Sequence, residues 1–248
     1  MSGRLLAGAS GYSFKEWCGP FYPEKTKAEQ MLPYYSERLP TVEINNTFYR
    51  MPRVAMLESW FSCTPPTFRF GIKASRRITH ISRLKAESAA ESVGYLYKAL
   101  EALGDKRGPV LFQLPPNLKK DLPRLEAFLP LLPKDHFAAF EFRNETWFSD
   151  DVYDALKKVG AALVLSERED NAPPPLVETA SWGYLRLRLE NYSDADLEAW
   201  AKRVAGTGWK ETFAYFMHEP TAPAYAKTLM SVFMADSGVP SRQGKSTG

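Results

Sequence analysis

Short runs of apolar residues alternate along the chain with longer stretches in which apolar residues recur every three or four positions. The short runs predict β-strands, and the longer stretches predict amphipathic helices. The predicted strands cover residues 4–10, 41–45, 68–73, 110–114, 137–143, 161–166, 183–188 and 213–217. The predicted helices lie near residues 27–39, 53–63, 86–103, 121–132, 150–159, 194–205 and 222–235.

Eight strands, most of them followed by a helix, predict a parallel β-sheet. Eight such units in about 240 residues are typical of an α/β protein with a single (β/α)8 barrel of the TIM type. An open doubly wound sheet is the alternative, but it usually carries a glycine-rich first turn. The first turn here, Gly8-Ala9-Ser10-Gly11, is equally typical of an ordinary tight turn. We therefore expect one barrel domain over residues 1–236 and a disordered tail over residues 237–248.

Side chains alternate between the two faces of a strand, so the sequence also predicts which residues point into the barrel. In the strand 41–45, Val42 and Ile44 share the face that packs on helices, which leaves Glu43 and Asn45 facing inward. The same alternation places further polar side chains inside, mainly near the carboxyl ends of the strands. They are Lys73, Gln113, Glu141, Arg143 and Arg186, with Arg188 as a further candidate.

Two interpretations of these inward charges remain open. An isolated buried charge is costly, so the charges could form a satisfied salt-bridge network, with Glu43 and Lys73 on adjacent strands as the obvious pair. Alternatively, they line a polar pocket, because the sites of TIM barrels lie at the carboxyl ends of the strands. Without Arg188 the group has three positive and two negative charges, which favours an anionic ligand.

The connection after the third strand is basic and lies on the same face as the strand ends. It contains Arg76, Arg77, His80 and Arg83, which predict phosphate contacts unless the segment is simply a solvated loop. Aromatic residues also follow strand ends, where they suit either the stacking of bases and sugars or plain packing on the barrel rim. They are Tyr12, Trp17, Phe48, Tyr49, Trp147 and Phe148. His218, at the end of the last strand, is a candidate general base.

Composition narrows the classes of function. The 248 residues include 32 Lys and Arg against 29 Asp and Glu, and a net charge of +3 does not by itself indicate nucleic-acid binding. Three histidines and two cysteines, without CxxC or HExxH, exclude a multi-histidine metal cluster and a zinc ribbon, so we expect no metal and no organic cofactor. The chain has no apolar run of about 18 residues and no signal-peptide pattern, which is typical of a cytoplasmic protein outside the membrane.

Characteristic motifs follow one another in a fixed order over residues 8 to about 150. They are Gly8-Ala9-Ser10-Gly11-Tyr12-Ser13-Phe14-Lys15-Glu16-Trp17, Phe21-Tyr22-Pro23, Val42-Glu43-Ile44-Asn45-Asn46-Thr47-Phe48-Tyr49-Arg50-Met51-Pro52, Phe68-Arg69-Phe70-Gly71-Ile72-Lys73-Ala74, Ile78-Thr79-His80, Val110-Leu111-Phe112-Gln113-Leu114-Pro115-Pro116 and Phe140-Glu141-Phe142-Arg143, with Trp147. In these motifs the chain closely resembles the domain-of-unknown-function-72 family, also called the YecE-like family. The resemblance implies a TIM-type barrel and no known reaction.

The later strand ends differ from the pattern of that family. The family tends to have Asp after strand 6, Arg-x-His-Gly after strand 7 and an Asn-rich end to strand 8. This chain has Ser166-Glu167, Arg186-Leu187-Arg188-Leu189 and Met217-His218-Glu219 at those places.

The sequence favours an enzyme that acts on an anionic, phosphate-bearing substrate at the mouth of the barrel. In this interpretation Glu43 or Glu141 is the general acid or base, and Asn45 and Gln113 orient the substrate. The anion is bound by Lys73, Arg143 and Arg186. One alternative is a nucleic-acid-binding module without catalysis, which uses the basic connection and the rim aromatics. Another is a glycoside hydrolase, in which the two glutamates form the carboxylate pair.

Overall fold

The computed structural model describes residues 3–167, 174–217 and 219–236. Eight parallel strands follow one another in sequence order and close into a barrel, with β8 paired back to β1. The strands are β1 (Arg4–Ala9), β2 (Thr41–Ile44), β3 (Arg69–Lys73), β4 (Arg107–Gln113), β5 (Ala138–Glu141), β6 (Ala162–Ser166), β7 (Trp182–Leu187) and β8 (Glu211–Phe216). The predicted (β/α)8 barrel is therefore confirmed. His218 and the predicted tail 237–248 lie outside the described residues.

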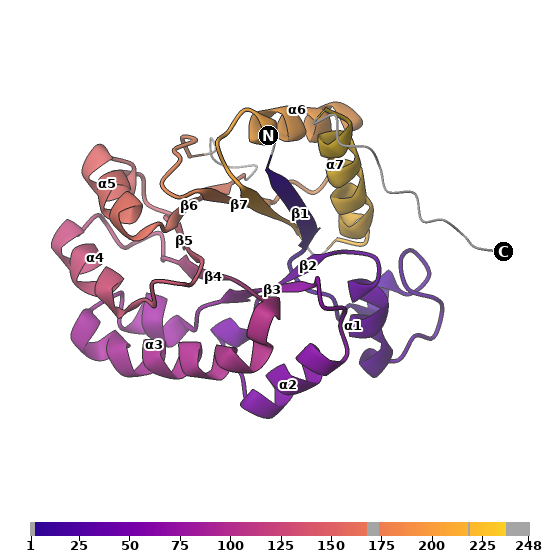
Figure 1. Cartoon of the computed structure of the whole chain (residues 1–248), viewed down its shortest axis with the longest axis horizontal. Helices are drawn as coiled ribbons and strands as arrows, with labels where there is room; N and C mark the ends of the chain where they lie inside the picture. Colours follow the sequence, from indigo (N-terminus) through magenta and orange to yellow (C-terminus); the bar gives the residue numbers. More distant parts are fainter. Residues whose placement is uncertain (1–2, 168–173, 218, 237–248) are drawn as a thin grey trace.

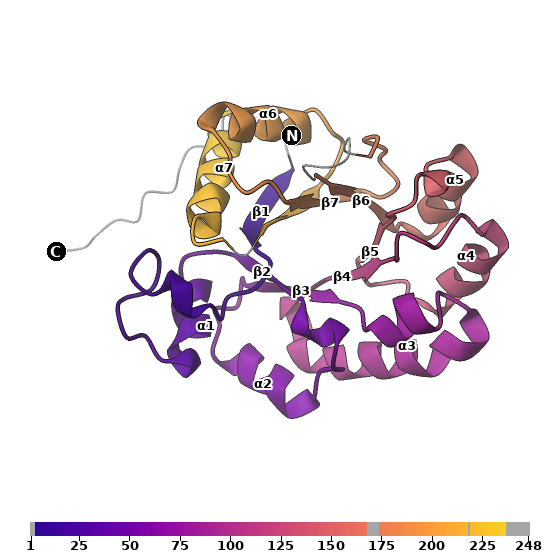
Figure 2. The ribbon, with the colours of Figure 1, turned by 180° about the vertical axis from the view of Figure 1, so that it is seen from behind.

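Helices surround the barrel as an outer ring (Figure 1). They are α1 (Ala28–Ser36), α2 (Val54–Ser62), α3 (Ala86–Leu100), α4 (Leu122–Phe128), α5 (Asp150–Val159), α6 (Asp194–Ala205) and α7 (Ala222–Asp236). Between β6 and β7 the described part of the connection, 174–181, contains no helix, as the view from behind also shows (Figure 2). Thr179 contacts the outer barrel wall there instead, with its hydroxyl hydrogen-bonded to the backbone of Ala161 and Leu163. No helix in the described part of the chain is long and apolar enough to cross a membrane.

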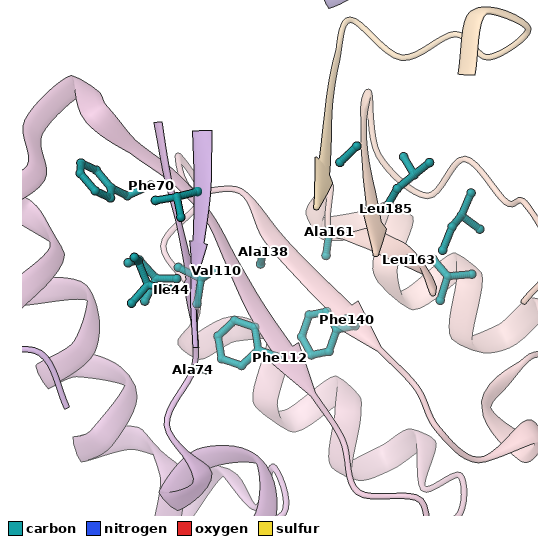
Figure 3. Packing of buried hydrophobic residues seen from close by; sticks show 14 of the residues in the cluster. Ile44, Phe70, Ala74, Val110, Phe112, Ala138, Phe140, Ala161, Leu163 and Leu185 are labelled. Atoms are coloured by element: carbon teal, nitrogen blue, oxygen red, sulfur yellow. The ribbon is translucent and has the colours of Figure 1, made fainter. Parts of the chain in front are cut away.

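The outward faces of the strands pack against the helices through large apolar side chains. Phe70, Phe112 and Phe140 are completely buried. Figure 3 shows Phe112 and Phe140 side by side on β4 and β5, and their stacked ring centroids are 5.2 Å apart. Each such phenylalanine contributes about 1.5–3 kcal/mol through burial, so the outer layer fixes the direction in which alternate residues point. The alternation predicted for these strands is confirmed.

The inner face of the barrel changes character along each strand. Toward the amino ends it holds a second apolar cluster, which includes Leu6, Leu111, Ala139, Val164, Trp182, Tyr184 and Phe213. One inward position further along, the side chains become polar on several strands. Leu111 is followed by Gln113, Ala139 by Glu141, Val164 by Ser166 and Tyr184 by Arg186. The polar groups therefore gather at the carboxyl ends of the strands, on a floor of apolar residues.

A glycine makes room for one of the inner tyrosines. Gly71 lies on the inner face of β3, and a Cβ atom at this position would lie 2.6 Å from the hydroxyl oxygen of Tyr215. The missing side chain lets Tyr215 reach across the barrel, where its hydroxyl lies 2.9 Å from Oγ1 of Thr41. The Tyr215 ring also packs on Tyr184, with ring centroids 5.2 Å apart. These aromatic side chains fill the space directly beneath the charged groups.

Candidate functional site

A buried arginine joins the two glutamates that the sequence places in the mouth of the barrel. Arg186 on β7 donates from Nη1 to Oε2 of Glu141 at 2.6 Å and from Nη2 to Oε1 of Glu43 at 2.7 Å. All three side chains are at most 1% exposed. The closed barrel therefore brings β2, β5 and β7 together at one guanidinium group.

The pair expected between Glu43 and Lys73 is replaced by the pair between Glu43 and Arg186. The reason is the register of β2 and β3. Glu43 lies opposite Gly71, so Lys73 stands two residues further toward the mouth. Arg186, which crosses the barrel interior, reaches Glu43 instead.

Glu43 accepts four hydrogen bonds in this position. Besides Arg186, its carboxylate receives the Ser10 hydroxyl at 2.8 Å, the Asn45 amide at 2.9 Å and the Tyr184 hydroxyl at 2.6 Å. Burial by itself would raise the pKa of Glu43, but the charge and hydrogen bond of Arg186 outweigh it and hold the pKa at about 2. The carboxylate therefore stays ionised at neutral pH.

Glu141 is held in a similar way on the other side of Arg186. Nε2 of Gln113 donates to it at 2.8 Å, and Nε of Arg143 lies 3.3 Å from its other oxygen. Burial would raise the pKa of Glu141, but Arg186 and the other nearby arginines hold it well below its usual range. Gln113 is only 3% exposed, so its amide orients Glu141 rather than a ligand.

These bonds argue against general acid–base catalysis by either glutamate. A general acid near neutral pH needs a raised pKa, whereas Glu43 and Glu141 have lowered ones. They also argue against a glycoside hydrolase. Both carboxylates bind the same guanidinium, which occupies the space between them that a sugar or an attacking water would need.

Lys73 reaches the mouth from the end of β3. Its ammonium nitrogen lies 4.4 Å from the centre of the Phe48 ring. Burial, assisted by the positive charge of Arg186, lowers the pKa of Lys73 to about 8. This amine therefore carries a positive charge that is readily lost at mildly alkaline pH.

Arg188 lies just past the end of β7 and borders a pocket. It faces inward two residues after Arg186, and its buried Nε has no hydrogen-bond partner among the described residues. Burial and the charge of Arg186 lower its pKa to about 10. Arg188 lines a pocket of about 570 Å³ together with Ser10, Tyr12 and Asn45. The amide of Asn45 also contacts the buried network, so the pocket opens directly above it.

The basic connection after β3 folds more tightly than a solvated loop. Residues Arg77–Ile81 form a single π-helical turn, a feature that is frequent at functional sites. His80 lies inside this turn, with Nδ1 2.9 Å from the Thr79 hydroxyl and its ring against Phe48. Burial, followed by the charge of Lys73, lowers the pKa of His80. Arg76 and Arg77 are exposed on its outer side.

Two aromatic residues predicted to contact a ligand are instead part of the core. Trp17 and Trp147 are both completely buried. Trp17 packs between Tyr22 and Tyr35, while Trp147 stacks on Phe142 and donates its indole N–H to a backbone carbonyl at 2.7 Å. Each tryptophan ends a short 3₁₀ turn that returns the ring to the barrel wall, which corrects the expectation of ligand contact. Tyr12, in contrast, lines the pocket.

Sequence reasoning missed two residues that complete the network, Ser10 and Tyr184. Both occupy inward positions, at the end of β1 and in the middle of β7. The same alternation, extended over Leu6, Gly8 and Ser10, would have found the serine. Among the described residues, no group of three or more His, Cys, Asp or Glu side chains could hold a metal ion. The charged groups of the site bond to one another, as Arg186 does to Glu43 and Glu141, or border the pocket, as Arg188 does.

Comparison with known proteins decides the family. The sequence model described as "Protein of unknown function DUF72" matches residues 6–246. The chain belongs to the DUF72 family. UPF0759 protein YunF of Bacillus subtilis (strain 168) is 29% identical to it over 204 residues, which cover 77% of this chain and 71% of YunF. The DUF72 family is defined by sequence and carries no stated reaction.

Solved structures of DUF72 proteins share the fold of this chain. A DUF72 family protein from Thermotoga maritima MSB8 has a TM-score of 0.78 at 24% identity, covering 95% of this chain and 99% of that one. A DUF72 family protein from Enterococcus faecalis V583 has a TM-score of 0.74 at 16% identity, covering 98% and 100%. At these identities the similarity establishes the DUF72 barrel, and function has to be argued from the mouth of the barrel itself.

Proposed function

We propose that this protein is an enzyme that binds an anionic, phosphate-bearing substrate in the pocket at the mouth of the barrel. The observation that supports the proposal is the position of Arg188. Its guanidinium is largely buried, lines a pocket of about 570 Å³ and has no hydrogen bond or ion pair to the described residues. A guanidinium is well suited to bind a phosphate group through two parallel hydrogen bonds.

The charge balance around the pocket supports an anionic ligand. The buried network and its neighbours comprise four cationic side chains and two carboxylates, an excess of two positive charges. They are Lys73, Arg143, Arg186 and Arg188 against Glu43 and Glu141. Arg186 is already neutralised by the glutamates, so it holds the network in place rather than the ligand. Lys73, Arg143 and Arg188 supply the attraction for the anion.

Lys73 is the residue best suited to proton transfer. General acid–base catalysis is most efficient when the pKa of the catalytic group lies near the working pH. The pKa of Lys73, about 8, meets this condition, whereas those of Glu43 and Glu141 do not. We therefore assign proton transfer to Lys73, and we assign to the two glutamates the task of positioning Arg186.

Binding of phosphate compounds by calorimetry tests the proposal. Inorganic phosphate, ribose 5-phosphate and adenosine monophosphate form a suitable panel of probes. The wild-type protein is expected to bind at least one of them, and Arg188→Met to weaken that binding at least tenfold, with Arg188→Lys intermediate because lysine keeps the charge but loses the paired hydrogen bonds.

Arg4→Met is a matched control for this experiment. Arg4 is half-exposed at the amino end of β1, on the opposite side of the barrel from the pocket, and pairs with Glu211 at 3.6 Å. Its substitution is expected to leave phosphate binding unchanged. Absence of binding by the wild type, or equal binding by Arg188→Met, would refute the proposal.

A further inference from the structure

Two more grooves open beside the mouth pocket, and the β2–α2 connection lines both of them. One groove, of about 500 Å³, is lined by Asn46, Tyr49, Met51 and Arg53 among others. The second, of about 430 Å³, extends past Arg77 to Tyr95 on α3. Tyr49 lines both grooves and also the mouth pocket, so the three hollows meet at its side chain. The two grooves share Tyr49, Arg50, Met51 and Arg53, so together they form one track beside the mouth pocket, and an elongated hollow of this kind suits a chain molecule.

We propose that this track binds single-stranded nucleic acid. The proposal is separate from the chemistry assigned to the mouth pocket and stands on the surface features of the rim alone. We call the track, with the adjacent Arg76, the rim groove.

Exposed arginines line the rim groove. Arg50, Arg53 and Arg77 border it and Arg76 adjoins it, and all four are exposed. Within the described part of the chain none of their guanidinium groups forms an ion pair or hydrogen bond. Glu91 is a carboxylate on the same groove, but the lining arginines outnumber it three to one. The result is a positively charged strip that suits a row of phosphates.

Aromatic rings stand open to solvent on the same strip. Tyr49 is 74% exposed and Tyr95 is 51% exposed, which is unusual for large aromatic side chains. The Tyr49 ring lies perpendicular to that of Phe48, with ring centroids 5.1 Å apart, so one edge of the tyrosine contacts the protein while most of the ring faces solvent. Exposed rings in the same groove as arginines provide stacking surfaces for bases and charge for phosphates.

Single-stranded nucleic acid fits this combination better than other polyanions. An acidic peptide or a sulfated polysaccharide would use the arginines but would gain nothing from two flat, exposed rings. A duplex keeps its bases stacked on one another, so they are not available to the tyrosines. Only an unpaired strand offers both phosphates and free base faces at the spacing of successive nucleotides.

Fluorescence anisotropy with a labelled oligothymidylate of about 12 nucleotides tests the inference, since such a strand covers a typical single-strand site. We expect Tyr49→Ala to weaken binding roughly tenfold through loss of stacking, and Tyr49→Phe to bind like the wild type because the ring is retained. The logarithm of the binding constant should fall with the logarithm of salt concentration with a slope of about −3, for four phosphate contacts. The double variant Arg53→Ala, Arg77→Ala should bring this slope to about −1.4.

Arg4→Ala, at the opposite end of the barrel, is the control and should leave the affinity unchanged. An abasic strand of the same length separates stacking from charge. Equal affinity for the abasic strand, equal affinity of Tyr49→Ala, or no binding at low salt would each overturn the inference.

The variants also separate this inference from the proposed function. Arg53 and Arg77 do not line the mouth pocket, so the double variant should bind the oligonucleotide more weakly and keep its phosphate binding. Arg188→Met should do the reverse, with oligonucleotide affinity within about twofold of wild type. Loss of both activities in either variant would show that the rim groove and the pocket are one site, and would overturn the inference as stated.

Discussion

Arg186 lies on β7 and Arg188 follows just past its end, and the surroundings of the two side chains differ sharply. Arg186 is 1% exposed and bonded to both Glu43 and Glu141. Arg188 lines an open pocket, and its buried Nε has no partner among the described residues. Burial raises the cost of charge for both. Glu43 and Glu141 attract both guanidinium groups, but they are bonded only to Arg186. The pKa values move accordingly, upward for Arg186 and down to about 10 for Arg188.

The difference shows how one step along a barrel strand separates a structural charge from a binding charge. At the level of Arg186 the barrel is closed, so the charged groups there pair with one another. One inward position further, the strands end and a ligand from solvent can supply the partner. The two arginines therefore make opposite predictions when they are removed.

The largest effect is expected for Arg186→Met. Removal of the guanidinium leaves two buried carboxylates without a counter-charge, which costs about 3–5 kcal/mol in the free energy of unfolding. Arg188→Met, the matched variant, is expected to change the free energy of unfolding by less than about 1 kcal/mol, because Arg188 has no bonded partner among the described residues. Urea unfolding at pH 7 measures both. Similar losses in the two variants would remove the distinction between a structural and a binding arginine.

The stability of the protein in acid tests the buried network around Arg186 through its partner Glu43. The pKa of Glu43 is about 2 in the native state and near 4.5 in the unfolded chain, so the unfolded state binds more protons between these values. Stability from this carboxylate is therefore fully present above about pH 4.5 and is lost as the pH falls toward 2. We expect the urea midpoint to drop steeply over this range in the wild type and less steeply in Glu43→Gln.

Glu198→Gln is the control for acid stability, because Glu198 is exposed on α6. It should follow the wild-type curve. A Glu43→Gln curve as steep as that of the wild type would contradict the assignment of this pH dependence to the buried network.

The sequence predicted which residues enter the mouth but not how they pair. Alternation along the strands depends only on local geometry, so it placed Glu43, Glu141 and Arg186 on the inner face correctly. Pairing depends on the register between strands and on contacts across the closed barrel. It therefore could not be read from neighbouring positions such as Glu43 and Lys73.

The rim residues show a second limit of sequence reasoning. Trp17, Trp147 and Tyr49 all follow strand ends, but only Tyr49 is exposed. The two tryptophans are returned to the core by short 3₁₀ turns that have no clear signature in the sequence. The family motifs include all three residues. They identify the barrel, but they do not show that the two tryptophans are buried and Tyr49 is exposed.

Lys73→Met is expected to stabilise the protein by about 1 kcal/mol at pH 7, a figure that allows for the partial exposure of the side chain. The native pKa of Lys73 is about 8, below the usual 10.5, so the charged form is less favourable in the native state than in the unfolded state. The unfolded state binds more protons between pH 8 and 10.5, and wild-type stability should rise over this range until the advantage of the variant disappears. Urea unfolding at pH 7, 9 and 10.5 checks the sign. A destabilised variant would contradict this expectation and support the salt bridge between Lys73 and Glu43 that the sequence suggested.

The smallest effect on folding is expected for Arg143→Ala. The surroundings of Arg143 are intermediate between those of Arg186 and those of Arg188. Its Nε is 3.3 Å from Glu141 and its side chain is 27% exposed. Glu141 keeps its shorter bonds to Arg186 and Gln113, so the variant strands no carboxylate. We expect a loss of at most about 1 kcal/mol, the usual contribution of a partly exposed ion pair.

Arg124→Ala is a matched control for Arg143→Ala, because Arg124 forms a partly exposed pair with Asp121 at 2.9 Å at the start of α4 and does not line the mouth pocket. The two variants should have similar stability, but only Arg143→Ala should bind inorganic phosphate more weakly in calorimetry. A loss of about 3–5 kcal/mol would instead place Arg143 with Arg186 in the buried network. Unchanged phosphate binding would remove Arg143 from the anion site and leave the positive charge of the mouth to Arg188 and Lys73. Because stability and binding are measured on the same variant, each outcome assigns Arg143 to one side of the boundary between structural and binding charge.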